Sequence, residues 1–295
     1  MKRKITTFVV VLILLVGLSL LLYPTVSDYL QTLQHRRIIS EYLTQVEELD
    51  DTSYQEVLQA AEAYNTELAN GSESLVYLPK AKHERYNSLL NVSGNGVMGY
   101  IQIKSINVAL PIYHGADETV LQVGVGHIEG SSLPVGGETA HCLLSGHRGL
   151  PSATLFTHLD RLAEGDIFTL RILREAYTYQ IDRIEVVLPE ELNTLKMEAG
   201  EDYCTLITCT PYGVNTHRLL VRGHRIETPP EEAELPPPAP PEKDLRFWII
   251  GGAVAFVLLI LVIFFICRKK KRADPEETKE EPTPPTDADE DKTVD

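Results

Sequence analysis

Two uncharged apolar runs frame the chain and predict two membrane-crossing helices. The first, from Ile5 to Ser27, follows basic residues at positions 2–4, and the second, from Phe247 to Cys267, directly precedes "RKKKR" at 268–272. Each run is long enough to cross a hydrocarbon layer of about 30 Å as a helix. Because basic residues favour the cytoplasmic side, both termini are expected in the cytoplasm and residues 28–246 outside. No small-x-small cleavage pattern follows the first run, so we expect residues 1–27 to be a retained signal anchor.

A helical pattern follows the first run. Apolar residues recur at helical spacing between Ile38 and Leu49, and "SYQE" (Ser53–Glu56) has the form of a capping box for a second helix. Asn70-Gly71 is a typical helix stop. Residues 28–71 therefore predict a helical hairpin that serves as scaffold.

From about Gly96 the pattern changes to short alternating segments broken by Gly and Pro, which predict strands. In chain order these segments are "MGYIQI", "HCLLSG", "FTLRIL", "AYTYQIDRIEVVL", "CTLITC" and "RLLVRGHRI". Short strands without helical segments between them indicate a mainly β, closed barrel over residues 96–226. Residues 72–95 form a linker or lid-like region ahead of it.

Composition changes again after the barrel. Residues 227–246 are rich in Pro and Glu and predict an extended stalk before the second membrane helix at 247–267. Residues 268–295 form a basic, then acidic tail, in which 273–295 hold ten acidic residues and two lysines, and this composition predicts disorder. Residues 273–295 supply −8 of the net charge of −15, and the remaining −7 gives no reason to expect nucleic-acid binding.

Four cysteines are too few for disulfide bonds to stabilise a fold of this size. Cys267 is expected at the cytoplasmic membrane edge, which leaves Cys142, Cys204 and Cys209 outside, an odd number that predicts at least one free thiol. Cys142 and Cys204 lie inside apolar strand sequence and are expected to be core residues. Cys209 ends its strand just before "TPYG" and, by alternation, faces away from Cys204. A buried structural thiol and a reactive thiol both fit Cys209 on this pattern alone.

Two basic residues could activate a thiol at that position. His147 lies just past the end of another strand, between two glycines, and a histidine paired with a cysteine can carry out acyl transfer. Arg218 lies nine residues after Cys209, where the next strand returns, and its guanidinium could stabilise an oxyanion. His141 and His147 could also suggest zinc, but no third ligand stands at suitable spacing, so no metal is expected.

The motifs around these residues resemble the sortases, membrane-tethered cysteine transpeptidases of Gram-positive bacteria. "TLITCTPYGVNTHRLLVRG" (Thr205–Gly223) and "LSGHRG" (Leu144–Gly149) carry the resemblance. The class C, pilus-assembling branch is further matched by "LPIYHGADETVLQVGVGHIEGSSLPVGG" and "GLPSATLFTHLDRL". The resemblance covers roughly residues 86–226 and implies a sortase-type closed barrel of about eight strands.

The resemblance also implies residue roles and a reaction. Cys209 would be the nucleophile, His147 the general acid/base and Arg218 the oxyanion and substrate stabiliser. An LPxTG-like sorting signal would be cleaved between Thr and Gly through a thioester, and a pilin lysine would resolve it without a cofactor. The family's lid motif, Asp-Pro-aromatic, has no match in "SESLVYLPKAKHERYNSLL" (Ser72–Leu90), so either a lid uses other contacts or it is absent.

Two alternatives remain open from the sequence. The first is a sortase that anchors surface proteins to the cell-wall cross-bridge, which differs from a pilus-assembling enzyme in the acceptor amine. The second is a non-catalytic surface adhesin or stalk protein in which Cys209 is inert. The expected partners are therefore pilins or other proteins with sorting signals, the amine acceptor and the membrane.

Overall fold

The computed structural model describes residues 2–71, 80–233, 250–254, 257–258 and 261. Four predictions lie partly or wholly outside these residues. They are the first part of the lid-like region (72–79), the greater part of the stalk (234–246), most of the second membrane helix (247–267) and the tail (268–295). The pieces at 250–254 and 257–258 are helical.

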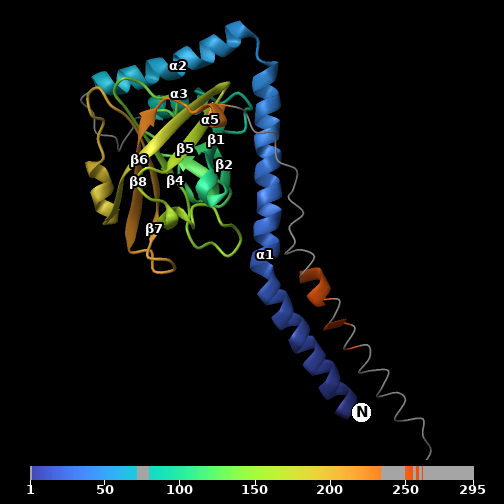
Figure 1. Cartoon of the computed structure of the whole chain (residues 1–295). Coiled ribbons are helices and arrows are strands. Elements are labelled where there is room, and N and C mark those ends of the chain that lie inside the picture. The colour runs from blue at the N-terminus through green and yellow to red at the C-terminus, as the bar shows by residue number, and fades with distance from the viewer. Residues whose placement is uncertain (1, 72–79, 234–249, 255–256, 259–260, 262–295) are drawn as a thin grey trace, which may run out of the picture. The chain divides into compact units, whose positions relative to one another are not determined.

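The centre of the fold is the closed eight-stranded β-barrel that the resemblance implied (Figure 1). Around the barrel the strand order is β1-β2-β3-β4-β7-β8-β6-β5. Most neighbours are antiparallel, whereas the β2–β3 and β4–β7 pairs are parallel. The strands are β1 (Val97–Ile103), β2 (Val108–His114), β3 (Val125–His127), β4 (Ala140–Ser145), β5 (Ile167–Ile172), β6 (Glu175–Val187), β7 (Asp202–Thr210) and β8 (His217–Ile226).

Short helical segments connect the strands, and the six strands predicted from alternation correspond to β1 and β4–β8. The elements between strands are η1 (Lys104–Ile106), α4 (Glu118–Leu121), η2 (Leu159–Arg161) and η3 (Pro189–Thr194), and α3 (Lys80–Ser88) precedes β1. The main core fills the barrel, and a smaller apolar cluster of Leu143, Ile207 and Leu220 lies on the opposite face of β4, β7 and β8. Leu192 and Leu195 of the β6–β7 connection pack against this outer cluster.

The predicted N-terminal hairpin is present as α1 (Lys2–Glu48) and α2 (Asp51–Asn70). The first helix is continuous with the predicted membrane segment and contains Pro24. By length and composition, α1 is the one helix among the described residues that could cross a membrane. The prediction of a capping box at Ser53–Glu56 is wrong, because α2 is capped by Asp50, whose carboxylate accepts from the backbone N–H of Ser53.

The predicted extended stalk begins differently from the expectation. Pro230–Ala233 forms a short helix, α5, and Glu232 is buried against the barrel. Lys104 Nζ lies 2.8 Å from Glu232 Oε1, and the Arg171 guanidinium donates to the Glu232 carbonyl. The Lys104 ion pair compensates the burial of the carboxylate, and both contacts hold the first residues after β8 on the barrel. Composition alone does not reveal such long-range partners.

Candidate active site

The three sequence-predicted site residues lie in one row across adjacent strands. In the antiparallel β7–β8 pair, Cys209 is directly opposite Arg218. In the parallel β4–β7 pair, Ser145 is aligned with Ile207, and the Gly146 N–H continues the pairing to Ile207 O at 3.0 Å. Two residues further along each segment, His147 lies just past the end of β4 and Cys209 is the next-to-last residue of β7. Because neighbouring strands are about 5 Å apart, the backbone brings all three residues together.

Strand alternation places this row on the outer face of the barrel. Cys209 is two residues beyond Ile207, which packs in the outer cluster, whereas Cys204 and Leu206 point into the main core. Cys209 is partly exposed, and Cys142 and Cys204 are buried and unbridged, as the sequence predicted. Burial raises the pKa of the Cys204 thiol well above its ordinary value, so this thiol stays protonated. Cys209 is therefore the accessible thiol among the described cysteines.

A carboxylate that the sequence analysis missed contacts His147. Glu118, the first residue of α4, places Oε1 3.3 Å from His147 Nε2. Glu118 Oε1 also accepts from Gln122 Nε2 at 2.6 Å. These two hydrogen bonds, first from Gln122 and then from His147, lower the pKa of Glu118, so it is ionised near neutral pH. The contact joins residues 29 positions apart, and only the N-cap form of "DET" hinted that a helix begins there.

Close packing fixes the backbone on both sides of His147. A Cβ on Gly146 would lie 2.6 Å from Cδ2 of Phe156, a fully buried ring. The Gly146 carbonyl accepts from Thr208 Oγ1 at 2.7 Å, and the His147 carbonyl accepts from the Phe156 N–H at 3.1 Å. The glycine is needed because the chain passes directly against this ring. The position of His147 is therefore set by the core beneath it.

Arg148 fastens the segment after His147 to the end of β7. Its guanidinium donates to Asp160 and, at 3.3 Å, to Thr210 Oγ1. The same guanidinium lies 5.9 Å from the centroid of the Tyr212 ring in the β7–β8 turn. It links the two loops that border the row of candidate residues.

The side chains of the row are not yet joined by hydrogen bonds. Arg218 Nη1 donates to the carbonyls of Asn215 and His217, at 3.2 and 3.0 Å. Among the described contacts, the Cys209 thiol has no hydrogen-bond partner and His147 faces Glu118. Catalytic hydrogen bonds are often long in a substrate-free enzyme and shorten when substrate binds. The backbone register, rather than a preformed contact, brings the three groups together.

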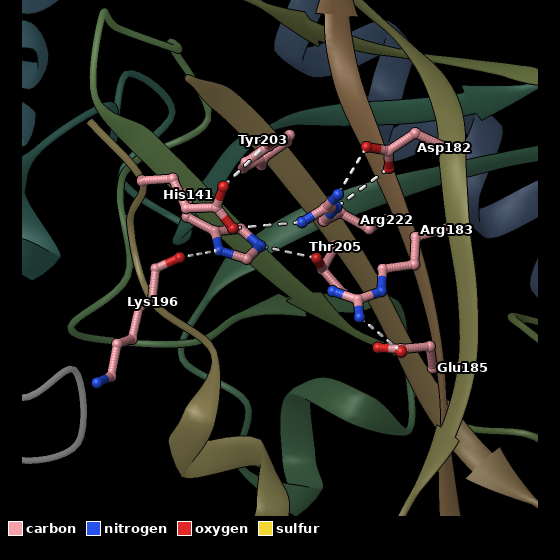
Figure 2. A network of polar contacts seen from close by, with 9 residues as sticks. His141, Asp182, Arg183, Glu185, Lys196, Tyr203, Thr205 and Arg222 are labelled. Atoms are coloured by element: carbon pink, nitrogen blue, oxygen red, sulfur yellow. Dashed lines mark hydrogen bonds and ion pairs between the residues drawn. The ribbon is translucent and has the colours of Figure 1, made fainter. Parts of the chain in front are cut away.

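A polar network supports the β6–β7 connection on the same outer face (Figure 2). His141 uses both ring nitrogens, Nδ1 with the Lys196 carbonyl and Nε2 with Thr205 Oγ1, each at 2.7 Å. Arg222 binds Asp182 through two nitrogens, at 3.1 and 2.8 Å, beside this pair (Figure 2). Since both nitrogens of His141 are engaged, it is not available as a metal ligand together with His147. No group of potential metal ligands occurs among the described residues.

The other histidines occupy structural positions where the structure gives their contacts. His114 bonds the carbonyls of Gly96 and Leu89, and His127 contacts the hydroxyl of Tyr86. His217 pairs with Thr210 in the sheet, on the face opposite to that of Cys209 and Arg218, and contacts its neighbour Thr216. None of these contacts reaches the row of Cys209, His147 and Arg218.

Comparison with known proteins identifies the fold. The family model described as "Sortase domain" matches residues 101–226. Sortase D of Bacillus subtilis is 30% identical over 131 residues, which cover 43% of this chain and 63% of that protein. The chain thus spans less than two thirds of this curated relative.

Solved structures match over greater lengths. The crystal structure of sortase C1 from Streptococcus agalactiae is 49% identical with a TM-score of 0.64, and the match covers 65% of this chain and all of the other. Sortase C from Clostridium perfringens, solved with the C-terminal cell wall sorting motif, is 42% identical with a TM-score of 0.57, covering 65% and 98%. The chain belongs to the sortase family of cysteine transpeptidases, and class C sortases are among its structural neighbours.

Proposed function

We propose that this protein is a membrane-anchored transpeptidase that uses Cys209, His147 and Arg218 to cleave LPxTG-like sorting signals between Thr and Gly. The observation that carries the proposal is the single row of these residues, with His147 just after β4 and Cys209 on β7 directly opposite Arg218 on β8. A thiol, an imidazole and a guanidinium on one face supply the three groups that acyl transfer from a peptide requires.

The reaction proceeds in two stages. The Cys209 thiolate attacks the Thr carbonyl carbon, and the negative charge that develops on the carbonyl oxygen is stabilised by the Arg218 guanidinium. The protonated His147 ring gives its proton to the Gly nitrogen as the C–N bond breaks, which leaves a thioester. An incoming amine then attacks this thioester, His147 takes up the amine's proton, and Cys209 is released as thiolate.

We propose a pilin lysine as the acceptor amine, so that successive transfers polymerise pili. The similarity to sortase C structures supports this choice, and the structure of Clostridium perfringens sortase C with the C-terminal cell wall sorting motif supports the class of donor. Attachment to the cell-wall cross-bridge remains the second candidate, because it differs in the acceptor alone. The basic flank of α1 favours a cytoplasmic N-terminus and an external catalytic barrel.

Intact-mass measurement tests the proposal directly. The full chain in detergent is incubated with an LPxTG-type peptide without acceptor, and an adduct with the mass of the acylated Thr fragment is expected. Cys209→Ala should abolish the adduct, while Cys142→Ala, which removes a buried thiol on β4, should keep it. An adduct that persists in Cys209→Ala, or its absence from the unmodified chain, would reject the proposal and favour a non-catalytic surface protein.

The acceptor is tested separately. A peptide containing the lysine segment of a pilin and an oligoglycine compete for the preformed thioester, and the products are distinguished by mass. An isopeptide with lysine as the main product supports pilus assembly. Preferential transfer to oligoglycine would instead support cell-wall anchoring.

A further inference from the structure

Exposed apolar side chains of the barrel gather at the end that carries Cys209. Val186 and Leu188, at the end of β6, are 60% and 41% exposed, and Tyr212 and Val214, in the β7–β8 turn, are 60% and 64% exposed. Among the described residues from 97 to 226, these four are the large apolar residues whose side chains are exposed to solvent. We call these four residues the rim patch. The reaction chemistry described above uses none of them.

The helix α1 runs from this end of the barrel to the opposite end. Asp28 Oδ1 accepts from the Thr154 N–H at 2.7 Å, in the loop that follows β4, and so meets the end where β4 and β7 finish. Further along α1, the Tyr42 hydroxyl donates to the Met98 carbonyl at the start of β1 and accepts from the Leu173 N–H in the β5–β6 turn. Strand directions place these later contacts at the other end of the barrel.

The order of these contacts tells which end of the barrel is nearer the membrane segment. Asp28 is the first charged residue after the uncharged run Ile5–Ser27. Tyr42 lies 14 residues further on, which is about 21 Å along a helix at 1.5 Å per residue. The end that carries Cys209 is therefore next to the point where the apolar helix leaves the bilayer. Pro24 lies one turn before Asp28, so a bend there changes the tilt of the barrel but leaves this same end nearest the membrane.

Contacts at this end of the barrel fix the position of Tyr212 in the rim patch. The Tyr212 ring lies beside the Arg148 guanidinium, and a Cβ on Gly149 would come within 3.2 Å of that ring. Thr154, which holds Asp28, belongs to the same loop as Arg148 and Gly149. The loop thus joins α1 at Asp28 to Tyr212 of the rim patch. A tyrosine beside aliphatic residues is well suited to the interface between lipid and water.

We propose that the rim patch contacts the phospholipid surface of the membrane that holds the N-terminal apolar helix. The site would then face the bilayer across a short distance instead of pointing away from it. Peptide segments that emerge from the same membrane would reach Cys209 without crossing the height of the barrel, a consequence that rests on the proposed function. The lipid contact itself rests on the α1 contacts and the four exposed side chains alone.

Tryptophan quenching in vesicles tests the contact without requiring turnover. The full chain with Trp248→Phe, which removes its single tryptophan, is reconstituted in phosphatidylcholine–phosphatidylglycerol vesicles with or without brominated acyl chains. Val214→Trp and Leu188→Trp report on the rim patch, each in its own preparation. Gln59→Trp is the matched control, because Gln59 is exposed on α2, which contacts the far end of the barrel through Tyr54 and Glu175.

The expected result is at least twofold stronger quenching by brominated lipid at positions 214 and 188 than at 59, with the reverse order for aqueous iodide. Equal quenching at all three positions, or none at the rim, would overturn the proposal. The tryptophans at positions 214 and 188 could instead be shielded from iodide only after a sorting-signal peptide is added. That result would assign the rim patch to peptide binding and would also overturn the proposal. Because Cys209→Ala protein can be used throughout, this outcome is independent of whether the chain is a transpeptidase.

Discussion

Replacing each of two arginines on one face of β8 by lysine should separate catalysis from stability. Arg218 is opposite Cys209, and its described hydrogen bonds go to two carbonyls of its own turn, at 3.2 and 3.0 Å. Arg218→Lys keeps the positive charge but loses the planar fork that can hold an oxyanion beside the thiol. Loss of one oxyanion donor costs roughly 10²–10³ in kcat, or about 2.7–4 kcal/mol. Since the turn carbonyls are near water, the free energy of unfolding should change by less than about 1 kcal/mol.

Arg222 is the matched control, four residues along the same strand face. It binds both carboxylate oxygens of Asp182 and lies 4.1 Å from the Tyr203 ring centroid. The pair is mostly shielded, with side-chain exposures of 18% and 24%. Arg222→Lys cannot keep both hydrogen bonds and the ring contact, so it should lower the free energy of unfolding by about 1–2 kcal/mol and leave kcat/KM within about threefold.

Two assays distinguish the variants. Release of a fluorogenic sorting-signal peptide gives kcat/KM, and urea unfolding gives stability. The reasoning is wrong if Arg218→Lys turns over near normally, or if Arg218→Lys and Arg222→Lys lose activity to the same extent. In either case Arg218 would not act on the reacting carbonyl.

Three further perturbations follow from the packing around the site. Gly146→Ala should destabilise the barrel by about 1–3 kcal/mol and lower kcat, because the new Cβ meets the buried Phe156 ring at 2.6 Å; unchanged melting and activity would contradict this. Burial lowers the pKa of His141 from its ordinary value of 6.5, so the unfolded chain binds a proton at this residue more readily than the folded chain. The free energy of unfolding, measured by urea titration at several pH values, should therefore fall as the pH drops below about 6.5. A free energy of unfolding that does not change with pH in this range would refute the prediction. Asn65→Ala should cost about 2–3 kcal/mol by thermal unfolding, because the buried amide makes three hydrogen bonds to the β3–β4 loop; an exposed control, Gln59→Ala, should cost almost nothing.

Alternation predicted the strands that are long and regular, and it failed where a strand lacks that pattern. β2 (Val108–His114) contains Pro111, and β3 (Val125–His127) is three residues long with a central glycine. Proline lacks a backbone donor and short glycine-containing segments carry little periodic signal, so neither reads as a strand. Both form because the closed barrel supplies partners on each side, with β2 pairing to β1 and β3.

The part of the site that depends on the register of neighbouring strands could be predicted from the local sequence. A turn of six residues (211–216) between Thr210 and His217 is enough to bring Arg218 back opposite Cys209. The contact between Glu118 and His147 was not predictable, because it depends on how α4 packs after two intervening strands. The same holds for Asp28 and Thr154, which are 126 residues apart. Long-range contacts of this kind come from the closed topology, which no single segment encodes.

Strand alternation also explains why one of two thiols on β7 is available for chemistry. Cys204 and Cys209 are five residues apart, an odd number, so they point to opposite faces of the same strand. Cys204 lies in the core beside Cys142, where burial raises its pKa, while Cys209 reaches the outer face at the strand end. Moving the strand by one residue would exchange the two environments and bury the thiol that faces Arg218. The register that closes the barrel and the register that presents a nucleophile are therefore the same, so variants that shift β7 should lose stability and activity together.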